Sequence, residues 1–314
     1  MKVLILGGTR FVGKKLASEL LLNGVDVTIT SRKELADFPI NRQIVSEREN
    51  LSPEIFLNQK YDFVLDFTGY KADQIAQLPK SLQTSNYLLM STSWIGRKCY
   101  STKGRSSLES LSEGILTPAE GIYVEEKLKS EIMASEVFGK RATIVRLPMI
   151  IGQGDHHRRL EFYANRLTIL KRPLLVNDGT NQVHTVLVED VVKLLTDLLD
   201  VSFDERPPLI NFTPPSSIPL RALIMSLAAA IGQEARFTSI RSEEFAMSLP
   251  ILAKVEPFWR EVPCDSIGAS IWSLLATKPT PWEVAFRKMK FDKQISEQQM
   301  EAMLEEKEYL DGNS

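Results

Sequence analysis

The first fourteen residues constrain the fold more than any other part of the chain. They read MKVLILGGTRFVGK, in which the apolar run 3–6 meets the glycine pair Gly7 and Gly8. Gly13 follows, and leucines then recur at helical spacing from Leu16. The order of strand, tight turn and helix predicts a βαβ unit and therefore a parallel sheet. Glycines let such a turn approach a pyrophosphate, which the free N–H groups at the helix start would bind.

Composition sets wide limits on this fold. A chain of 314 residues can form one large α/β domain or two smaller ones. Its 38 basic and 40 acidic residues nearly balance, so no overall field favours nucleic acid or an anionic membrane. Cys99 and Cys264 are far apart, and the adjacent His156 and His157 lack a third ligand, so we expect no metal site. Without a signal peptide or an apolar run long enough to span a bilayer, the sequence predicts a cytoplasmic protein with no membrane partner.

The end of the second predicted strand, residues 26–30, bears on the choice of dinucleotide. An acidic residue here binds the ribose 2′-hydroxyl of NAD, whereas a basic one suits the 2′-phosphate of NADP. This chain has Ser31 at the acidic position, followed by Arg32 and Lys33, and Arg10 in the glycine loop could reach the same place. These cations could also be ordinary surface residues. The pattern favours NADP, with NAD as the alternative.

Hydroxyl side chains follow two apolar runs that are typical of buried parallel strands. Thr68 and Gly69 follow the run 61–67, and the run 87–90 leads into a hydroxyl triplet, residues 91–93. In open α/β sheets, ligands bind at the carboxyl ends of the strands. Serine and threonine are also common in turns, so these residues alone establish no site.

A later helical segment carries Tyr123 and Lys127, which are four residues apart and share one face of the helix. A lysine ammonium beside a phenol favours the phenolate and lowers its pKa, so the tyrosine can exchange a proton near neutrality. A hydroxyl such as that of Thr92 could bind both the tyrosine and a substrate oxygen. The alternative is a partly buried tyrosine with a solvated lysine.

Together these motifs resemble the extended short-chain dehydrogenases/reductases of the NAD-dependent epimerase/dehydratase type. The matching segments are GGTRFVG (7–13), YDFVLDFTG (61–69), LLMSTS (88–93), YVEEK (123–127), RLPMIIGQGD (146–155) and VHTVLVEDVV (183–192). The resemblance covers about residues 1–290 and implies a Rossmann-type doubly wound parallel sheet with a smaller C-terminal substrate-binding lobe. It predicts a dinucleotide-binding domain over 1–150, with 182–212 returning to it. The lobe would hold 151–181 and 213–290, and residues 291–314 would form a peripheral charged tail.

The resemblance also implies roles for individual residues. Tyr123 would be the acid/base, Lys127 its pKa modulator and nicotinamide-ribose ligand, and Thr92 the substrate-orienting hydroxyl, with Ser91 and Ser93 as alternates. The implied cofactor-binding residues are Gly7, Gly8, Thr9, Arg10, Phe11, Val12, Gly13, Ser31, Arg32, Lys33, Phe67, Thr68, Gly69, Lys127 and Leu147. Candidate substrate-binding residues are Ser93 and the cations Arg158, Arg159, Arg221 and Arg260, although surface arginines usually carry no function.

The implied activity is that of an NAD(P)-dependent epimerase that acts on a nucleotide-linked sugar through a keto intermediate, and the resemblance also implies a homodimer. An NADPH-dependent keto-sugar reductase fits the same residues. A different class is a non-catalytic protein that senses NADP or binds RNA, as some relatives of the family do. Two departures from the family pattern stand out. Arg10 replaces the usual middle glycine, and Ser93-Trp94 replaces the Asp-Glu pair of the dehydratases, which makes water elimination the least expected chemistry.

Overall fold

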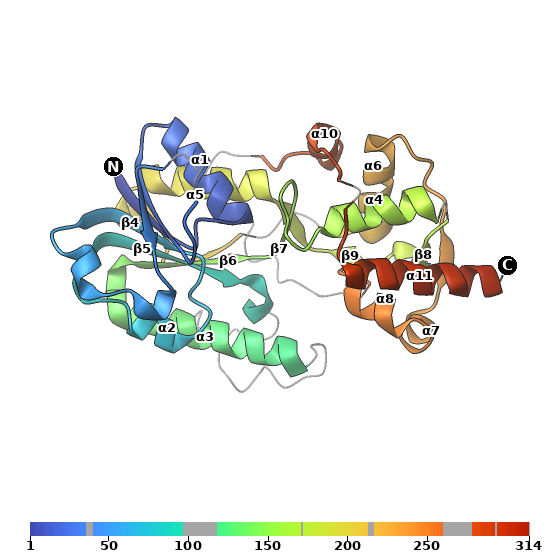
Figure 1. Ribbon diagram of the computed structural model, residues 1–314, viewed down its shortest axis with the longest axis horizontal. Coiled ribbons are helices and arrows are strands. Elements are labelled where there is room, and N and C mark those ends of the chain that lie inside the picture. The colour runs from blue at the N-terminus through green and yellow to red at the C-terminus, as the bar shows by residue number, and fades with distance from the viewer. Residues whose placement is uncertain are drawn as a thin grey trace. The chain divides into compact units, whose positions relative to one another are not determined.

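The computed structural model describes residues 1–35, 40–96, 118–170, 172–212, 217–259, 278–292 and 294–313 (Figure 1). These residues form two compact units. The first holds residues 1–148 and 188–212, and the second holds residues 149–187, 217–259 and 278–313. The chain re-enters the first unit at Val188 rather than at 182, because residues 182–187 pair within the second unit.

Helices and strands alternate along the first unit. Its strands are β1 (Lys2–Leu6), β2 (Asp26–Ser31), β3 (Arg42–Val45), β4 (Lys60–Asp66), β5 (Gln83–Thr92), β6 (Ala142–Leu147) and β11 (Leu209–Asn211). Its helices are α1 (Phe11–Leu22), α2 (Ala72–Ala76), α3 (Pro118–Phe138) and α5 (Val188–Asp200).

The second unit is mainly helical. Its short strands are β7 (Met149–Ile151), β8 (Leu174–Val176), β9 (Gln182–Val183), β10 (Thr185–Leu187), β12 (Ile218–Pro219) and β13 (Thr238–Ile240). Its helices are α4 (Arg159–Ile169), α6 (Leu220–Ala230), α7 (Ser242–Ser248), α8 (Pro250–Val255), α10 (Trp282–Lys288) and α11 (Glu297–Gly312).

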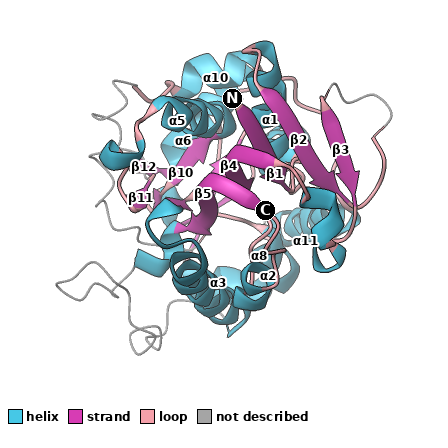
Figure 2. Ribbon diagram, turned by 90° about the vertical axis from the view of Figure 1, so that its left-hand side faces the viewer, coloured by secondary structure: helices cyan, strands magenta, loops and turns pink. Residues whose placement is uncertain are grey.

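The first unit is built on a seven-stranded sheet in the order β11-β6-β5-β4-β1-β2-β3, and every neighbouring pair is parallel (Figure 2). The chain adds β2 and β3 on one side of β1 and then β4, β5 and β6 on the other. The carboxyl ends of β1 and β4 therefore flank the point where the strand order reverses, which is where such sheets bind ligands. This arrangement confirms the predicted Rossmann-type fold.

Helices cover both faces of this sheet. Helices α1 and α5 pack together on one face, and α2 and α3 pack together on the other (Figure 1). Because side chains alternate along a strand, Leu4 and Leu6 of β1 both join the core beneath α2 and α3. The rings of Tyr87 and Phe138 stack in the same core, with centroids 3.9 Å apart, and fix α3 against β5. Helix α3 carries the predicted Tyr–Lys pair, so this packing positions the site.

The second unit corrects the expectation of a peripheral tail. Helix α11 packs against α8, and Ala302 and Met303 are buried there. Glu306 is also fully buried, and both of its carboxylate oxygens accept hydrogen bonds from Arg166 of α4 at 2.7 Å. One carboxylate of the charged tail therefore has its partner inside the unit. Across the described segments, no helix has the length and apolar character needed to cross a membrane.

Candidate active site

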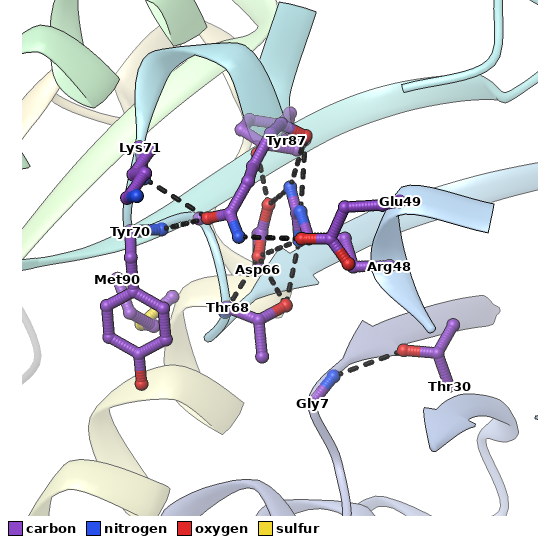
Figure 3. A network of polar contacts seen from close by, with 12 residues as sticks. Gly7, Thr30, Arg48, Glu49, Asp66, Thr68, Tyr70, Lys71, Tyr87 and Met90 are labelled. Atoms are coloured by element: carbon purple, nitrogen blue, oxygen red, sulfur yellow. Dashed lines mark hydrogen bonds and ion pairs between the residues drawn. The ribbon is translucent and has the colours of Figure 1, made fainter. Parts of the chain in front are cut away.

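The turn between β1 and α1 is too tight for side chains at its glycines. Gly7 has a φ of +90°, and a Cβ there would lie 2.5 Å from the Cγ2 atom of Thr68. A Cβ on Gly13 would lie 2.6 Å from the Gly7 carbonyl oxygen. The turn thus lies directly against the end of β4, and the Gly7 N–H donates to Thr30 Oγ1 at 3.3 Å (Figure 3). A turn without side chains at these glycines lets a pyrophosphate approach the backbone closely.

Arg10 replaces a family glycine without backbone strain. It is the N-cap of α1 with an extended backbone, φ −130° and ψ 151°, which any residue can adopt. Its side chain is exposed and makes no capping hydrogen bond, and no acidic residue lies in the first turn of α1. The N–H groups of this turn can therefore face an anion. The residues of the loop fit the phosphates of a dinucleotide.

Replacing Gly13 by alanine is expected to destabilise the protein by about 1–3 kcal/mol, because the new methyl group overlaps the Gly7 carbonyl. Chemical denaturation would measure the change. Gly121→Ala on α3 is the matched control, since nothing lies within 4 Å of its Cβ position. That variant should gain about 0.5–1 kcal/mol from helix propensity. Equal effects from the two substitutions would contradict the close approach at Gly13.

The end of β2 presents cations and holds its serine in place. The buried Ser31 hydroxyl donates to the Lys33 carbonyl at 2.8 Å and accepts from Gln43 Nε2 at 2.5 Å. The Ser31 side chain thus shapes the loop, and its contact with a dinucleotide stays a prediction. Arg32 and Lys33 are both exposed. The ribose position therefore has two available cations beside it.

The alternation of β5 separates the candidate hydroxyls. Ser91 points to α3, where its hydroxyl donates to Glu131 Oε1 at 2.6 Å. Glu131 is also bound by Arg146, through Nε at 2.9 Å and Nη2 at 2.6 Å. Thr92, the last residue of β5, accepts a hydrogen bond from the Trp94 N–H at 3.3 Å and lies near enough to the Tyr123 hydroxyl to lower the pKa of that phenol. The structure therefore brings Thr92 to Tyr123 and places Ser91 in a buried ion-pair network.

The Tyr123 side chain lies at the boundary between the protein and the solvent. It is 38% exposed, so a substrate can reach it, and its ring meets that of Trp94 edge-on at 6.2 Å. Partial burial, together with the nearby Tyr70, raises the pKa of Tyr123 to about 12, although Thr92 acts in the opposite direction. The sequence predicts a pKa lowered by Lys127, and the structure shows the opposite direction. The phenol is therefore protonated at neutral pH.

The direction of the Lys127 side chain explains this difference. Lys127 Nζ donates to the backbone carbonyls of Met90 at 3.0 Å and Gly69 at 3.2 Å, and lies 4.5 Å from the centroid of the Tyr70 ring. Only 2% of Lys127 is exposed. Burial lowers the pKa of Lys127 to about 8, against the opposing attraction of Asp66. The site therefore holds a lysine that can release its proton near neutrality.

A fully buried carboxylate, that of Asp66, lies at the end of β4 (Figure 3). Arg48 binds Asp66 through two hydrogen bonds, of 2.8 and 2.6 Å, and the Tyr87 hydroxyl donates to it at 2.5 Å. Burial opposes the charge of Asp66, but Arg48 and the hydrogen bonds from Tyr87 and the Thr68 N–H outweigh it and lower the pKa of Asp66. Burial and this carboxylate raise the pKa of Tyr87 well above its usual range.

The comparisons with known proteins identify the family. A family model described as "NAD dependent epimerase/dehydratase family" matches residues 3–211, about two thirds of the chain. This chain belongs to the NAD-dependent epimerase/dehydratase family. No curated protein matches it in sequence.

Solved structures resemble this family member along nearly its whole length. The dTDP-glucose 4,6-dehydratase of Bacillus anthracis str. Ames, in complex with NAD, is 12% identical with a TM-score of 0.66, covering 92% of this chain and 94% of its own. TunA, an NAD-dependent NDP-hexosamine 5,6-dehydratase, is 16% identical with a TM-score of 0.65, covering 94% and 100%. The UDP-glucuronic acid 4-epimerase of Bacillus cereus with NAD is 15% identical with a TM-score of 0.64, covering 91% and 94%. At these identities the likeness shows a shared fold.

Tyr70 is a site residue of this epimerase/dehydratase-family chain that the sequence analysis missed. It lies next to Gly69, covers Lys127 with its ring and raises the pKa of Tyr123. Burial and the charge of Asp66 raise the pKa of Tyr70, whereas the charge of Arg10 lowers it. Tyr70 therefore links the glycine loop to the Tyr–Lys pair. The signal in the sequence was a tyrosine directly after the glycine at the end of a buried strand.

The remaining predicted cofactor-binding residues differ in their burial. Gly8, Val12, Gly69 and Leu147 are buried, and Thr9, Phe11, Phe67 and Thr68 are partly exposed. Ser93 is buried at the start of the short helix Ser93–Gly96, directly after β5. Contact of these residues with a dinucleotide or a substrate stays a prediction.

The candidate substrate-binding cations have partners within the second unit. Arg158 donates to the Gln294 carbonyl at 2.7 Å, and Arg159 pairs with Asp155 at 2.8 Å. The Arg221 guanidinium lies 5.2 Å from the centroid of the Phe237 ring. Arg260 lies outside the described residues. Diphosphate binding by these arginines stays a prediction. Among the described residues, no cluster of three His, Cys, Asp or Glu side chains could hold a metal ion.

Proposed function

We propose that this chain is an NAD(P)-dependent enzyme that interconverts a hydroxyl and a keto group on a nucleotide-linked sugar, with Tyr123 as its acid/base. The observation that carries the proposal is the placement of Tyr123 and Thr92 beside each other at the carboxyl end of β5, where the Tyr123 ring also meets Trp94 edge-on, with the buried ammonium of Lys127 one helical turn away. The family and the sugar nucleotides named for the structural neighbours support the substrate class.

The residues of the site have separate tasks in this reaction. Bound NAD(P) would supply the hydride acceptor or donor. Thr92 would hold the reacting sugar oxygen beside the Tyr123 hydroxyl, so that one proton moves between that oxygen and the phenol. Lys127 would supply positive charge from the floor of the site, where low solvent access makes a charge act strongly. An epimerase returns the hydride to the opposite face of the same sugar.

A keto-sugar reductase is the second candidate, and one observation favours it. With a pKa of about 12, Tyr123 is a proton donor at neutral pH, which is the form that the reduction of a carbonyl consumes. The exposed Arg32 and Lys33 beside a serine support NADP, the 2′-phosphorylated dinucleotide, as the preferred cofactor. The cytoplasmic location and the homodimer stay predictions.

Cofactor binding by the purified protein tests the proposal. We expect NADPH to bind more tightly than NADH, as measured by nucleotide fluorescence. The double variant Arg32→Ala/Lys33→Ala should lose about tenfold or more in affinity for NADPH, because two charge-assisted contacts to a phosphate are removed. Its affinity for NADH should stay unchanged.

Controls separate the outcomes of this experiment. Lys193→Ala removes an exposed cation from the middle of α5 and should leave both affinities unchanged. Extraction of nucleotide from the denatured protein distinguishes the two activities, since an epimerase keeps its dinucleotide through purification and a reductase exchanges it. Tighter binding of NADH would overturn the NADP preference. Failure to bind either nucleotide at millimolar concentration would overturn the enzyme itself.

A further inference from the structure

Arg48 and Asp66 form an ion pair that is buried in the first unit. Arg48 begins the short helix Arg48–Asn50 after β3, and its side chain is 9% exposed against 0% for Asp66. Two such charges are expensive to remove from water, and apolar side chains of similar size can often replace them at no loss of stability. Ionisable groups whose pKa values are strongly shifted are often found at functional sites. Asp66 adjoins Gly69, and the Gly69 carbonyl accepts a hydrogen bond from Lys127.

Contacts run from Arg48 to the carbonyl that Lys127 binds. Arg48 donates to Thr68 Oγ1 at 2.8 Å and to the Gln74 carbonyl at 3.0 and 3.1 Å. It therefore binds the chain on both sides of the turn that follows β4. Gly69 lies within this turn, and a Cβ at Gly69 would lie 3.1 Å from Asp66 Oδ2. The Gly69 carbonyl accepts the hydrogen bond from Lys127 Nζ. The position of this carbonyl therefore depends on Arg48 and Asp66.

Each carboxylate that acts on Lys127 has an arginine of its own. Asp66 on β4 and Glu131 on α3 both attract the ammonium, but Arg48 holds the first and Arg146 holds the second. Phenols, which are neutral at pH 7, also lie near this group among the described residues: Tyr70 has its ring 4.5 Å from Lys127 Nζ, Tyr123 is on the same helix, and Tyr87 is bound to Asp66. Among the described residues, Lys127 itself is hydrogen-bonded to two backbone carbonyls.

We propose that Arg48 is a positioning residue for Lys127: it clamps the turn whose Gly69 carbonyl binds the ammonium, and it screens the ammonium from the Asp66 carboxylate. Lys127 is thereby held in place by dipoles instead of by a full negative charge, and it keeps a proton that it can release near neutral pH. This inference rests on the proposed function only in that Lys127 acts in catalysis.

The titration of Lys127 in the free protein tests the inference. Lysine labelled with ¹³C at Cε gives one NMR signal for each residue, and the signal that Lys127→Met removes is assigned to Lys127. Arg48→Met removes the cation that lowers the pKa of Lys127, so this pKa should rise by about one unit. Asp66→Asn removes the anion that raises it, so the pKa should fall by about one unit. The double variant should return towards the wild-type value.

Opposite shifts of the Lys127 pKa in the two single variants would support the proposal. If Arg48 and Asp66 had only a structural role, both substitutions would shift this pKa in the same direction, towards the value of an exposed lysine. Shifts of the same sign, or none, would overturn it. Lys15→Met, which breaks the partly exposed pair with Glu189 on the other face of the sheet, is the control and should move nothing. If Arg48→Met fails to fold, the comparison of Asp66→Asn with the double variant still gives the sign.

This test does not depend on cofactor or substrate. Opposite shifts in a protein that binds no NAD(P) would leave the clamp on Lys127 intact and overturn the proposed function alone. Shifts of the same sign in a protein that binds NADPH would overturn the role of Arg48 alone.

Discussion

Replacing Tyr123 by phenylalanine is expected to lower kcat by about 10²- to 10⁴-fold, which is the usual contribution of a positioned acid/base. The substitution removes only the hydroxyl that lies beside Thr92, and the ring keeps its edge-on contact with Trp94. Affinity for NADPH should therefore stay within about twofold, since no ion pair or core contact is lost. Turnover of a panel of nucleotide-linked sugars, followed by NMR of the sugar and by NADPH absorbance, would measure the effect.

Tyr70→Phe is the matched control for this prediction. Tyr70 is the neighbouring phenol, and its ring, which the substitution keeps, is the part that covers Lys127. Its loss of activity should stay below about tenfold. Thr92→Val should reduce turnover as well, because the Thr92 hydroxyl favours the ionised phenol and its loss raises the pKa of Tyr123 further. Full activity in Tyr123→Phe, with a large loss in Tyr70→Phe, would transfer the acid/base role to Tyr70.

The fold was predictable because its signals are local. Apolar runs at 3–6 and 61–67 became β1 and β4 to within a residue or two, and the predicted strand over 26–30 became β2, Asp26–Ser31. The glycine turn needed no partner to be recognised. The tail of the chain was predicted wrongly because its decisive contact is long-range. Nothing around Glu306 in the sequence indicates an arginine 140 residues earlier.

The candidate site divides in the same way. The spacing of Tyr123 and Lys127 places both on one side of α3, and this much follows from helix geometry. The choice between Ser91 and Thr92 depends on the phase of β5, which the sequence of the strand does not determine when both of its faces are buried. The pairing of Arg48 with Asp66 was hidden for a further reason. A carboxylate within a buried strand signals that a partner exists, but sequence alone does not say which residue it is.

The second large effect that we expect is on stability, from Arg166→Met in the second unit. Arg166 is 2% exposed, and its guanidinium binds both oxygens of Glu306 as well as Glu256. The Tyr163 hydroxyl donates to Glu256, and Glu306 also accepts from the Leu174 N–H at 2.6 Å. Removal of the cation leaves the buried Glu306 carboxylate beside Glu256 without its partner, and breaking a buried pair in this way costs about 3–5 kcal/mol. Chemical denaturation, with limited proteolysis of α11 as a local probe, would measure the loss.

The pH dependence of this unit makes the prediction sharper. Burial raises the pKa of Glu256 well above its usual range, and the charge of Glu306 raises it further. The folded protein thus holds a proton that the unfolded chain releases. The stability from this group is complete below the ordinary glutamate pKa and is lost as the pH rises through the raised value. Glu256→Gln, which stays neutral, should remove this loss and be more stable than the wild type at alkaline pH. Arg236→Met, which removes one partner of the exposed pair with Glu234, should change neither the stability nor its pH dependence. A wild-type stability that rises between neutral and alkaline pH would contradict the raised pKa of Glu256. An Arg166→Met variant as stable as Arg236→Met would show that Arg166 does not hold α11 in place.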